Sequence, residues 1–161
     1  MNIFREIKYL RGNTKGIFFL CFFRLSSFFT KNIFLKIIGL PIRLIYKLLV
    51  QWILGIDIPD IMKAGTAFNV YHGQGLVINE ATIFGDFVTI RQNTTIGNAK
   101  QNGKCPVIGN SVNIGANSVI IGDIKIGDNV IIGAGSVVVN NIPENSVIVG
   151  NPARIIKKTV P

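Results

Sequence analysis

One histidine carries most of the potential chemistry of this 161-residue chain. His72 is the only imidazole, and it lies in the run Tyr71-His72-Gly73-Gln74-Gly75. Histidine is the commonest general base at neutral pH, although it is also a common surface residue. A carboxylate beside it would fix its tautomer and stabilise its protonated form. Asp57 is the better-placed candidate for that role, and Asp60 is the alternative.

The cysteines and the single histidine exclude several other kinds of site. Two cysteines make neither a disulfide framework nor a four-cysteine zinc site, and one histidine excludes a His-rich metal centre. We therefore predict no metal site. Cys105 has no second histidine to activate its thiol, which disfavours a nucleophilic role. Cys21 fits a small buried hydrophobic residue, and we expect both thiols to be reduced.

Charge divides the chain into two parts that must position these residues. The net charge is +9, and residues 1–50 hold nine basic residues, one acidic residue and 8 of the 11 phenylalanines. The other 111 residues are almost neutral and are rich in glycine, isoleucine, valine and asparagine. The basic residues of the first part are interleaved with phenylalanine and isoleucine, and no nucleic-acid-binding motif accompanies them. We therefore do not expect nucleic-acid binding.

The basic segment, residues 1–55, is expected to form short amphipathic helices. Arg24, Lys36 and Lys47 interrupt its apolar runs, so none reaches the ~18 residues of a membrane-spanning helix. It also lacks the single apolar core and cleavage site of a secretory signal, which favours a cytoplasmic protein. Two interpretations remain open. The helices cap the rest of the chain, or residues 1–50 lie on an anionic membrane surface.

Residues 56–158 are organised by a repeat of six. Aliphatic or aromatic residues recur at this step, with one interruption: Ile78, Phe84, Ile90, Ile96, Ile108, Ile114, Ile120, Ile126, Ile132 and Val138. A period of six is typical of an all-β solenoid with three flat sides in each turn. Three hexapeptides per turn would align these residues in inward columns. The expected columns are Ile78-Ile96-Ile114-Ile132, then Ile90-Ile108-Ile126, then Phe84-Ile120-Val138.

Two departures from the repeat indicate where function lies. Val70 and Ile78 are eight residues apart instead of six, so we expect two extra residues to bulge at the corner that holds His72. Asp57 lies one turn earlier, and the two side chains are expected to approach across stacked turns. The second departure is the polar run at about 98–106, which has no inward aliphatic residue and is expected to leave the coil as a loop.

The repeat resembles that of the hexapeptide-repeat acyltransferases, which implies a left-handed parallel β-helix. Asp57, His72 and the segment Ile78-Asn79-Glu80-Ala81-Thr82 are similar to the serine acetyltransferases of that superfamily. This resemblance implies that His72 is the general base and Asp57 its partner. Serine acetyltransferases carry a second active-site histidine before a proline in the loop, where this chain has Cys105-Pro106, and they have a much longer helical domain.

The total length, the short basic segment and the Cys-Pro loop resemble more closely the acetyltransferases of bacterial exopolysaccharide and capsule clusters, colanic acid acetyltransferases among them. That resemblance implies acetyl transfer from acetyl-CoA to a sugar hydroxyl of a growing or lipid-linked glycan. It places Glu80 and Cys105 at the acceptor. A serine O-acetyltransferase and a non-catalytic β-solenoid scaffold are the alternatives.

The family resemblance further implies a homotrimer that binds coenzyme A in grooves between its subunits. The matching positions are Asn98, Ala99, Gly115, Ala116 and Ala134. A backbone N–H near Asn98 is the candidate oxyanion donor. The basic residues expected at the phosphates, with a solvated tail as the alternative, are Arg154, Lys157 and Lys158. Acceptors at the inner leaflet imply a cytoplasmic protein that is peripheral to the inner face of the plasma membrane.

Overall fold

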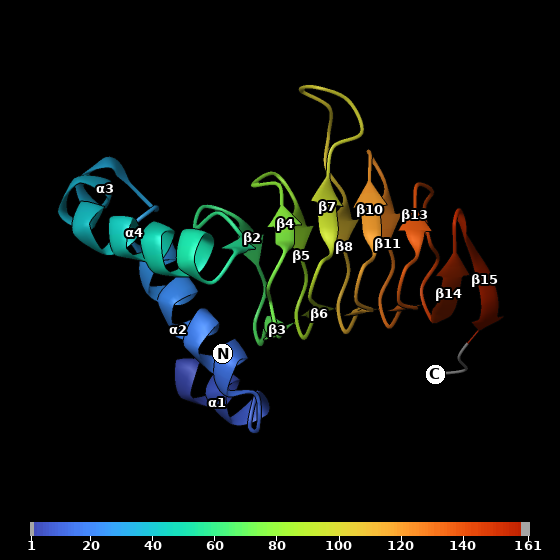
Figure 1. The fold of residues 1–161 in the computed structure, drawn as a ribbon, viewed down its shortest axis with the longest axis horizontal. Helices are drawn as coiled ribbons and strands as arrows, with labels where there is room; N and C mark the ends of the chain where they lie inside the picture. Colours follow the sequence, from blue (N-terminus) through green and yellow to red (C-terminus); the bar gives the residue numbers. More distant parts are fainter. Residues whose placement is uncertain (1, 159–161) are drawn as a thin grey trace.

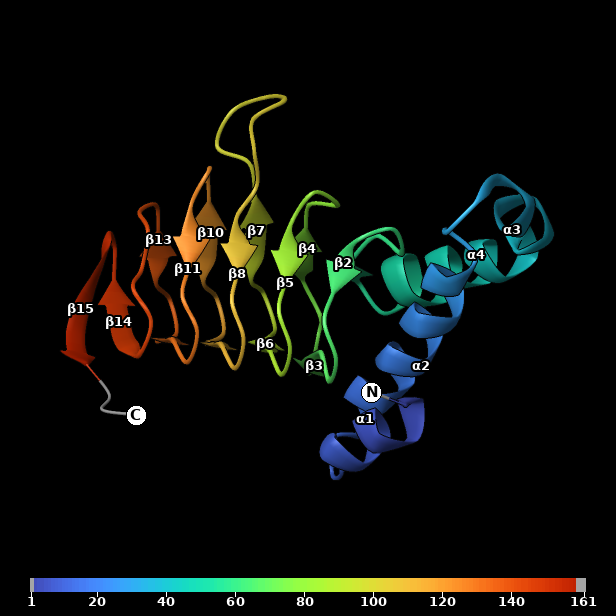
Figure 2. The ribbon, with the colours of Figure 1, turned by 180° about the vertical axis from the view of Figure 1, so that it is seen from behind.

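The computed structural model describes residues 2–158 and shows a parallel β-solenoid of about five turns with helices at its N-terminal end (Figure 1). Its short strands stack into three sheets that run along the solenoid axis, as the reverse view also shows (Figure 2). Strands of successive turns pair in parallel, and only the last two strands pair antiparallel. The predicted all-β solenoid with an N-terminal helical segment is confirmed.

Each sheet draws one strand from every turn that it spans. The five-stranded sheet contains β1 (Ile56–Asp57), β4 (Leu76–Ile78), β7 (Thr95–Gly97), β10 (Val119–Ile121) and β13 (Val137–Val138). The four-stranded sheet contains β2 (Lys63–Ala64), β5 (Ile83–Phe84), β8 (Val107–Ile108) and β11 (Lys125–Ile126). The six-stranded sheet contains β3 (Asn69–Tyr71), β6 (Thr89–Arg91), β9 (Asn113–Ile114), β12 (Ile131–Ile132), β14 (Ser146–Gly150) and β15 (Ala153–Lys158).

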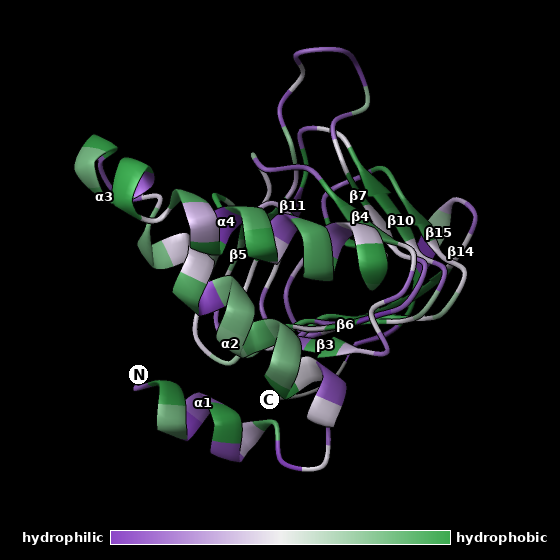
Figure 3. Ribbon diagram, turned by 60° about the vertical axis from the view of Figure 1, so that its left-hand side comes forward, coloured by the Kyte–Doolittle hydropathy of each residue, from purple (hydrophilic) through white to green (hydrophobic). Residues whose placement is uncertain are grey.

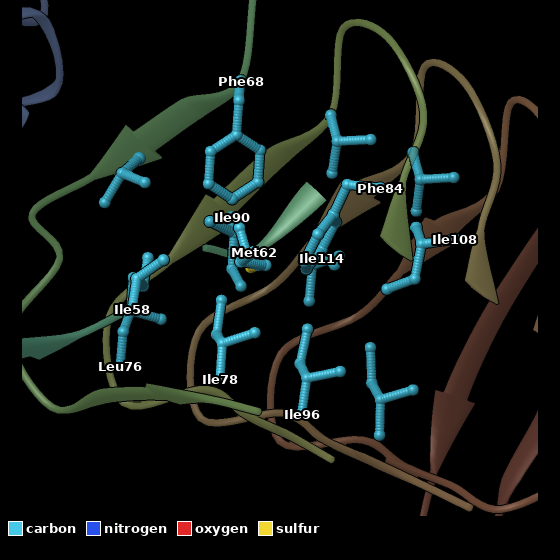
Figure 4. Packing of buried hydrophobic residues seen from close by; sticks show 14 of the residues in the cluster. Ile58, Met62, Phe68, Leu76, Ile78, Phe84, Ile90, Ile96, Ile108 and Ile114 are labelled. Atoms are coloured by element: carbon cyan, nitrogen blue, oxygen red, sulfur yellow. The ribbon is translucent and has the colours of Figure 1, made fainter. Parts of the chain in front are cut away.

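The hexapeptide aliphatic residues form the core of the solenoid. Successive side chains of a strand point to opposite faces, so each short strand directs one residue inward. Phe84 stacks on Ile108, and Ile108 on Ile126, in the four-stranded sheet. Figure 4 shows these side chains meeting inside the coil. No single turn could bury them, and the stack removes nearly all of them from water.

The predicted columns are correct on either side of the polar run and wrong across it. Ile78 opposes Ile96 as expected, but Ile96 then opposes Ile120 rather than Ile114. Ile114 instead opposes Ile90 in the six-stranded sheet. The reason is that the polar run leaves the coil completely, as the long loop between β7 and β8 in Figure 1 shows. The loop does not form a side of a turn. Every later hexapeptide therefore lies one side of the solenoid away from the place that an uninterrupted repeat predicts.

We predict that this loop can be shortened without loss of the fold. Deleting Ala99–Lys104 removes six residues and restores a six-residue step between Ile96 and Ile108. All six residues are exposed, so the free energy of unfolding should change by no more than about 1 kcal/mol. Urea unfolding followed by circular dichroism measures this change. A broad, non-cooperative transition in the shortened protein would contradict the register.

The N-terminal segment folds into five short helical elements. They are α1 (Ile3–Tyr9), α2 (Thr14–Phe28), α3 (Ile33–Ile38), α4 (Leu40–Tyr46) and the π-helix η1 (Lys47–Ile53). Phe19 and Phe23 of α2 are fully buried, and their rings lie 6.2 and 6.3 Å from that of Phe68 in the first solenoid turn. The capping interpretation is therefore confirmed for α2, which joins the solenoid core.

Polar contacts fix the helices to the solenoid at two further points. Glu6 is 4% exposed and accepts hydrogen bonds from Arg24 and from the backbone N–H of Ala67. Asp60 accepts from Arg43 Nε at 2.7 Å and from the Ser26 hydroxyl at 2.6 Å. Burial opposes ionisation of Asp60, but these hydrogen bonds outweigh it and hold the pKa of the carboxyl below its ordinary value. Asp60 is thus a structural anchor rather than the partner of His72.

None of the helices within residues 2–158 combines the length and the hydropathy needed to cross a bilayer.

Candidate active site

His72 lies in the bulge that the spacing predicts. β3 ends at Tyr71 and β4 begins at Leu76, and Ile56 opposes Leu76, so this turn holds two residues more than the regular turns of eighteen. His72 has a φ of +64°, and the N–H of Gly73 donates to the carbonyl of Tyr71 at 2.8 Å. A Cβ on Gly73 would lie 2.6 Å from Ile56, so glycine is required where the bulge folds back. The exposed imidazole is the consequence of this local backbone.

The start of α2 forms one wall of the space beside His72. A concavity of about 350 Å³ is lined by His72, Gln74, Leu54 and Ile56, and by Lys15 and other residues of α2. Sequence reasoning missed the contribution of α2, because it depends on how the helix docks rather than on any spacing. His72 remains exposed beside this wall.

Asp57 lies nearby but does not contact His72. Its Oδ1 accepts a hydrogen bond from Gln51 Nε2 at 3.1 Å, and it lines a separate cleft of about 660 Å³ with Trp52 and Lys47 of η1. Ion pairs within residues 2–158 join only Glu6 to Arg24, Asp60 to Arg43 and Asp123 to Lys104. No hydrogen bond or ion pair within residues 2–158 joins Asp57 to His72, and the two residues line different concavities, so their pairing stays a prediction.

The predicted ligand-binding residues fall on two edges of the five-stranded sheet. The edge shared with the six-stranded sheet, which we call the His72 edge, comprises residues 72–75, 92–94, 115–118 and 133–136. The edge shared with the four-stranded sheet, which we call the loop edge, comprises residues 79–82, 98–106, 122–124 and 139–141. One side of the coil, or roughly 16 Å for five extended residues, separates the two edges.

Gly115, Ala116 and Ala134 all lie on the His72 edge. The N–H of Gly135 donates to the carbonyl of Ala116 at 2.8 Å, so the two alanines stack one turn apart. A Cβ on Gly115 would lie 2.5 Å from the backbone nitrogen of Ala134, which explains the glycine at this corner. These small residues therefore lie in line along the solenoid axis, one turn apart.

Asn98, Ala99, Glu80 and Cys105 lie on the loop edge instead. Asn98 accepts a hydrogen bond from Asn79 and donates to the carbonyl of Lys100, which orders the base of the loop. Cys105 is 7% exposed, and burial raises the pKa of its thiol. A protonated, covered thiol agrees with the expectation that Cys105 is not a nucleophile. A single chain does not bring this edge to His72.

The basic residues of the last strand divide between two corners. Arg154 opposes Val149 near the end of β14, on the side of the His72 edge. Lys157 opposes Val147 and Lys158 opposes Ser146, at the start of β14 and at the other margin of the six-stranded sheet. The expected cluster is therefore split, and only Arg154 continues the line of Ala116 and Ala134.

Comparison with known proteins agrees with this architecture. Residues 105–140 match the family described as bacterial transferase hexapeptide (six repeats). The chain is 43% identical over 126 residues to WcaB of Escherichia coli strain K12, a protein assigned to colanic acid biosynthesis as an acetyltransferase, and the match covers 78% of both chains. This chain belongs to the hexapeptide-repeat acetyltransferases. It is an enzyme of acetyl transfer.

Serine acetyltransferases are also among the relatives of this chain. That of Staphylococcus epidermidis is 44% identical over 106 residues, which are 65% of this chain and 50% of the relative. The crystal structure of the Brucella abortus enzyme superposes with a TM-score of 0.78 at 32% identity and covers 90% of this chain and 58% of the relative. The same enzyme has been solved in complex with coenzyme A, with 30% identity over 91% of this chain and 57% of that one and a TM-score of 0.78. The chain thus spans about half the length of the serine acetyltransferases that it matches.

Proposed function

We propose that this acetyltransferase moves an acetyl group from acetyl-CoA to a sugar hydroxyl of a bacterial exopolysaccharide, of a capsule, or of its lipid-linked precursor. The observation that carries the proposal is the extent of the likeness to WcaB. Its 126 matched residues outnumber all the residues that follow the helical segment, so the match includes part of the helices. The likeness to the Staphylococcus epidermidis serine acetyltransferase, over 106 residues, requires no part of the helices.

His72 performs the central proton transfer in this proposal. Acetyl-CoA, when bound, supplies the acetyl thioester. The neutral imidazole accepts the proton of the acceptor hydroxyl as its oxygen bonds to the thioester carbonyl carbon. The imidazolium then protonates the departing thiolate as the carbon–sulfur bond breaks, and this step regenerates neutral His72. A positioned general base contributes about 10²–10⁴-fold to such a step.

The His72 edge supports a binding track for the donor. Four strand spacings separate β3 from β14, or about 19 Å along the axis. An extended donor could lie against the small residues Ala116 and Ala134, with its thioester near His72 and its phosphates near Arg154. The positions of Lys157 and Lys158 favour a solvated role for both.

We also propose a homotrimer, because the expected site is divided within one chain. Asn98, Ala99, Glu80 and Cys105 lie a full side of the coil away from His72. In a threefold assembly, the loop edge of one subunit can face the His72 edge of the next. A backbone N–H near Asn98 of the neighbour would then be available to the oxyanion. The assembly would work in the cytoplasm at the inner face of the membrane, where lipid-linked acceptors lie.

An acceptor screen tests the proposed reaction. Release of the coenzyme A thiol would be followed with a chromogenic disulfide, using deacetylated exopolysaccharide oligosaccharides, L-serine or no acceptor. We expect at least a tenfold rise in rate with an oligosaccharide and none with L-serine. A rise with L-serine alone would establish the serine O-acetyltransferase alternative. Failure of the protein to bind acetyl-CoA in equilibrium dialysis would leave the scaffold alternative.

A further inference from the structure

An apolar face of the helical segment has no partner within the chain. Residues 33–53 expose ten large hydrophobic side chains, namely Ile33, Phe34, Ile37, Ile38, Leu40, Leu44, Ile45, Leu48, Trp52 and Ile53. Phe34, Ile38 and Trp52 are more than 70% exposed. We call these ten residues the α3–η1 face. A patch of this size marks an interaction surface, because isolated apolar residues are normal on a soluble protein but a continuous group is not.

The exposed apolar side chains of the α3–η1 face recur along one side of each helix. In α3 the exposed side chains recur at Ile33, Phe34, Ile37 and Ile38, which is one side of a helix. Across α4 and η1 they recur every four residues from Leu40 to Trp52. The opposite side of α4 and η1 carries Tyr46 and Val50, which are buried in the core. Figure 3 shows hydrophobic positions, in green, along both α3 and α4.

The charges around the α3–η1 face indicate what kind of partner binds it. The sequence contains no aspartate or glutamate between Glu6 and Asp57. Lys31 and Lys47 are exposed at the margin of the face, whereas Arg43 is already paired with Asp60. A second copy of this face would bring like charges together, but an anionic lipid surface would neutralise them. Apolar side chains rimmed by cations are the pattern of helices that lie in a membrane interface.

We propose that the α3–η1 face docks this protein on an anionic membrane surface. This narrows the contact from the whole of residues 1–50 to the second half of the helical segment. α2 is excluded as the principal contact, because its most apolar side caps the solenoid through Phe19 and Phe23. The inference deepens the proposed function, but it rests on exposure and charge rather than on the reaction.

The docked orientation would bring lipid-linked acceptors to the site. Trp52 belongs to the α3–η1 face and also lines the cleft that contains Asp57. A lipid-linked glycan whose lipid stays in the bilayer would therefore emerge beside Asp57. Tryptophan favours the membrane–water interface, where its ring is apolar and its N–H is hydrated.

Vesicle binding tests the proposal with a matched pair of variants. Phe34 is 76% exposed on the α3–η1 face, and Phe4 is 75% exposed on α1, outside it. The full-length protein, F34E, I38E and F4E would be sedimented with phosphatidylcholine vesicles containing 30% phosphatidylglycerol, by mole, at roughly 0.1 M salt. We expect F34E and I38E each to bind at least tenfold more weakly than the wild type. F4E should bind like the wild type.

Trp52 supplies a second measurement, because it is the only tryptophan in the chain. Its emission should shift to the blue on binding and should be quenched by brominated lipids. No binding by the wild type, or equal weakening by F34E and F4E, would overturn the proposal. So would a fall in oligomer mass in F34E by analytical ultracentrifugation, because the face would then contact a second copy. Loss of vesicle binding would leave acetyl transfer to a water-soluble oligosaccharide intact, so the two proposals fail separately.

Discussion

Replacing His72 with asparagine should lower kcat for acetyl transfer by about 10²–10⁴-fold, because the general base is removed. Asparagine is a better test than alanine at this position. His72 has a φ of +64°, and asparagine adopts the left-handed region more readily than alanine. The bulge should therefore keep its shape while the proton acceptor is lost. The rate of coenzyme A release with saturating acetyl-CoA and an active oligosaccharide measures the effect.

Two further measurements on H72N separate catalysis from structure. His72 is exposed, so the free energy of unfolding should change by no more than about 0.5 kcal/mol. The affinity for coenzyme A should also stay within a few-fold of the wild type. Full activity of H72N would show that His72 is an ordinary surface residue and not the general base. A parallel loss of affinity and stability would mean that the bulge, rather than the imidazole, had been damaged.

The position of His72 could be predicted because it depends on counting alone. The eight-residue interval between Val70 and Ile78 breaks a strict repeat, and a solenoid can absorb extra residues only at a corner. Counting cannot predict whether the side chains of His72 and Asp57 touch. Such a contact depends on side-chain direction and on what else competes for the carboxylate, and Gln51 of η1 occupies one oxygen of Asp57.

Counting in steps of six residues fails across the loop. Residues 98–105 number more than one hexapeptide, so the sequence period alone cannot show whether they form a side or leave the coil. Polarity predicts the loop correctly, but the predicted columns assume that Asn102, in the middle of the polar run, still faces inward. Backbone pairing of Ile96 with Ile120 shows that it does not. A polar interruption in a solenoid therefore resets the register as well as forming a loop.

The helical segment illustrates the limit set by tertiary contacts. Its composition supported both capping and membrane docking, and the structure assigns capping to α2 while leaving the α3–η1 face exposed. The sequence pattern of α2 does not differ in kind from that of α3, α4 and η1, because both mix phenylalanine or isoleucine with lysine or arginine. The difference arises at the first turn of the solenoid, where α2 packs Phe19 and Phe23 against Phe68, whereas α4 and η1 bury only Tyr46 and Val50 and keep their other side exposed.

Phe68→Ala should destabilise the protein by about 3–5 kcal/mol. The ring is fully buried, and its centroid lies 4.9 Å from that of Phe84 in the next turn and 6.2 Å from that of Phe19 in α2. Its removal would leave a cavity between two elements that cannot approach each other, because the solenoid corners fix the first turn. The melting temperature should fall by roughly 6–20 °C for a chain of this size.

Two optical probes show whether this junction couples the helices to the solenoid. Infrared absorption in the amide I band reports the strands separately from the helices, and the fluorescence of Trp52 reports the helical segment. We expect both transitions to move together in F68A, because a shared core unfolds as one cooperative unit. F4A, which removes a 75% exposed ring, should change the free energy of unfolding by no more than about 0.5 kcal/mol. A shift of the Trp52 transition alone would show that the helices fold independently, and the helical segment could then move relative to the bulge that holds His72.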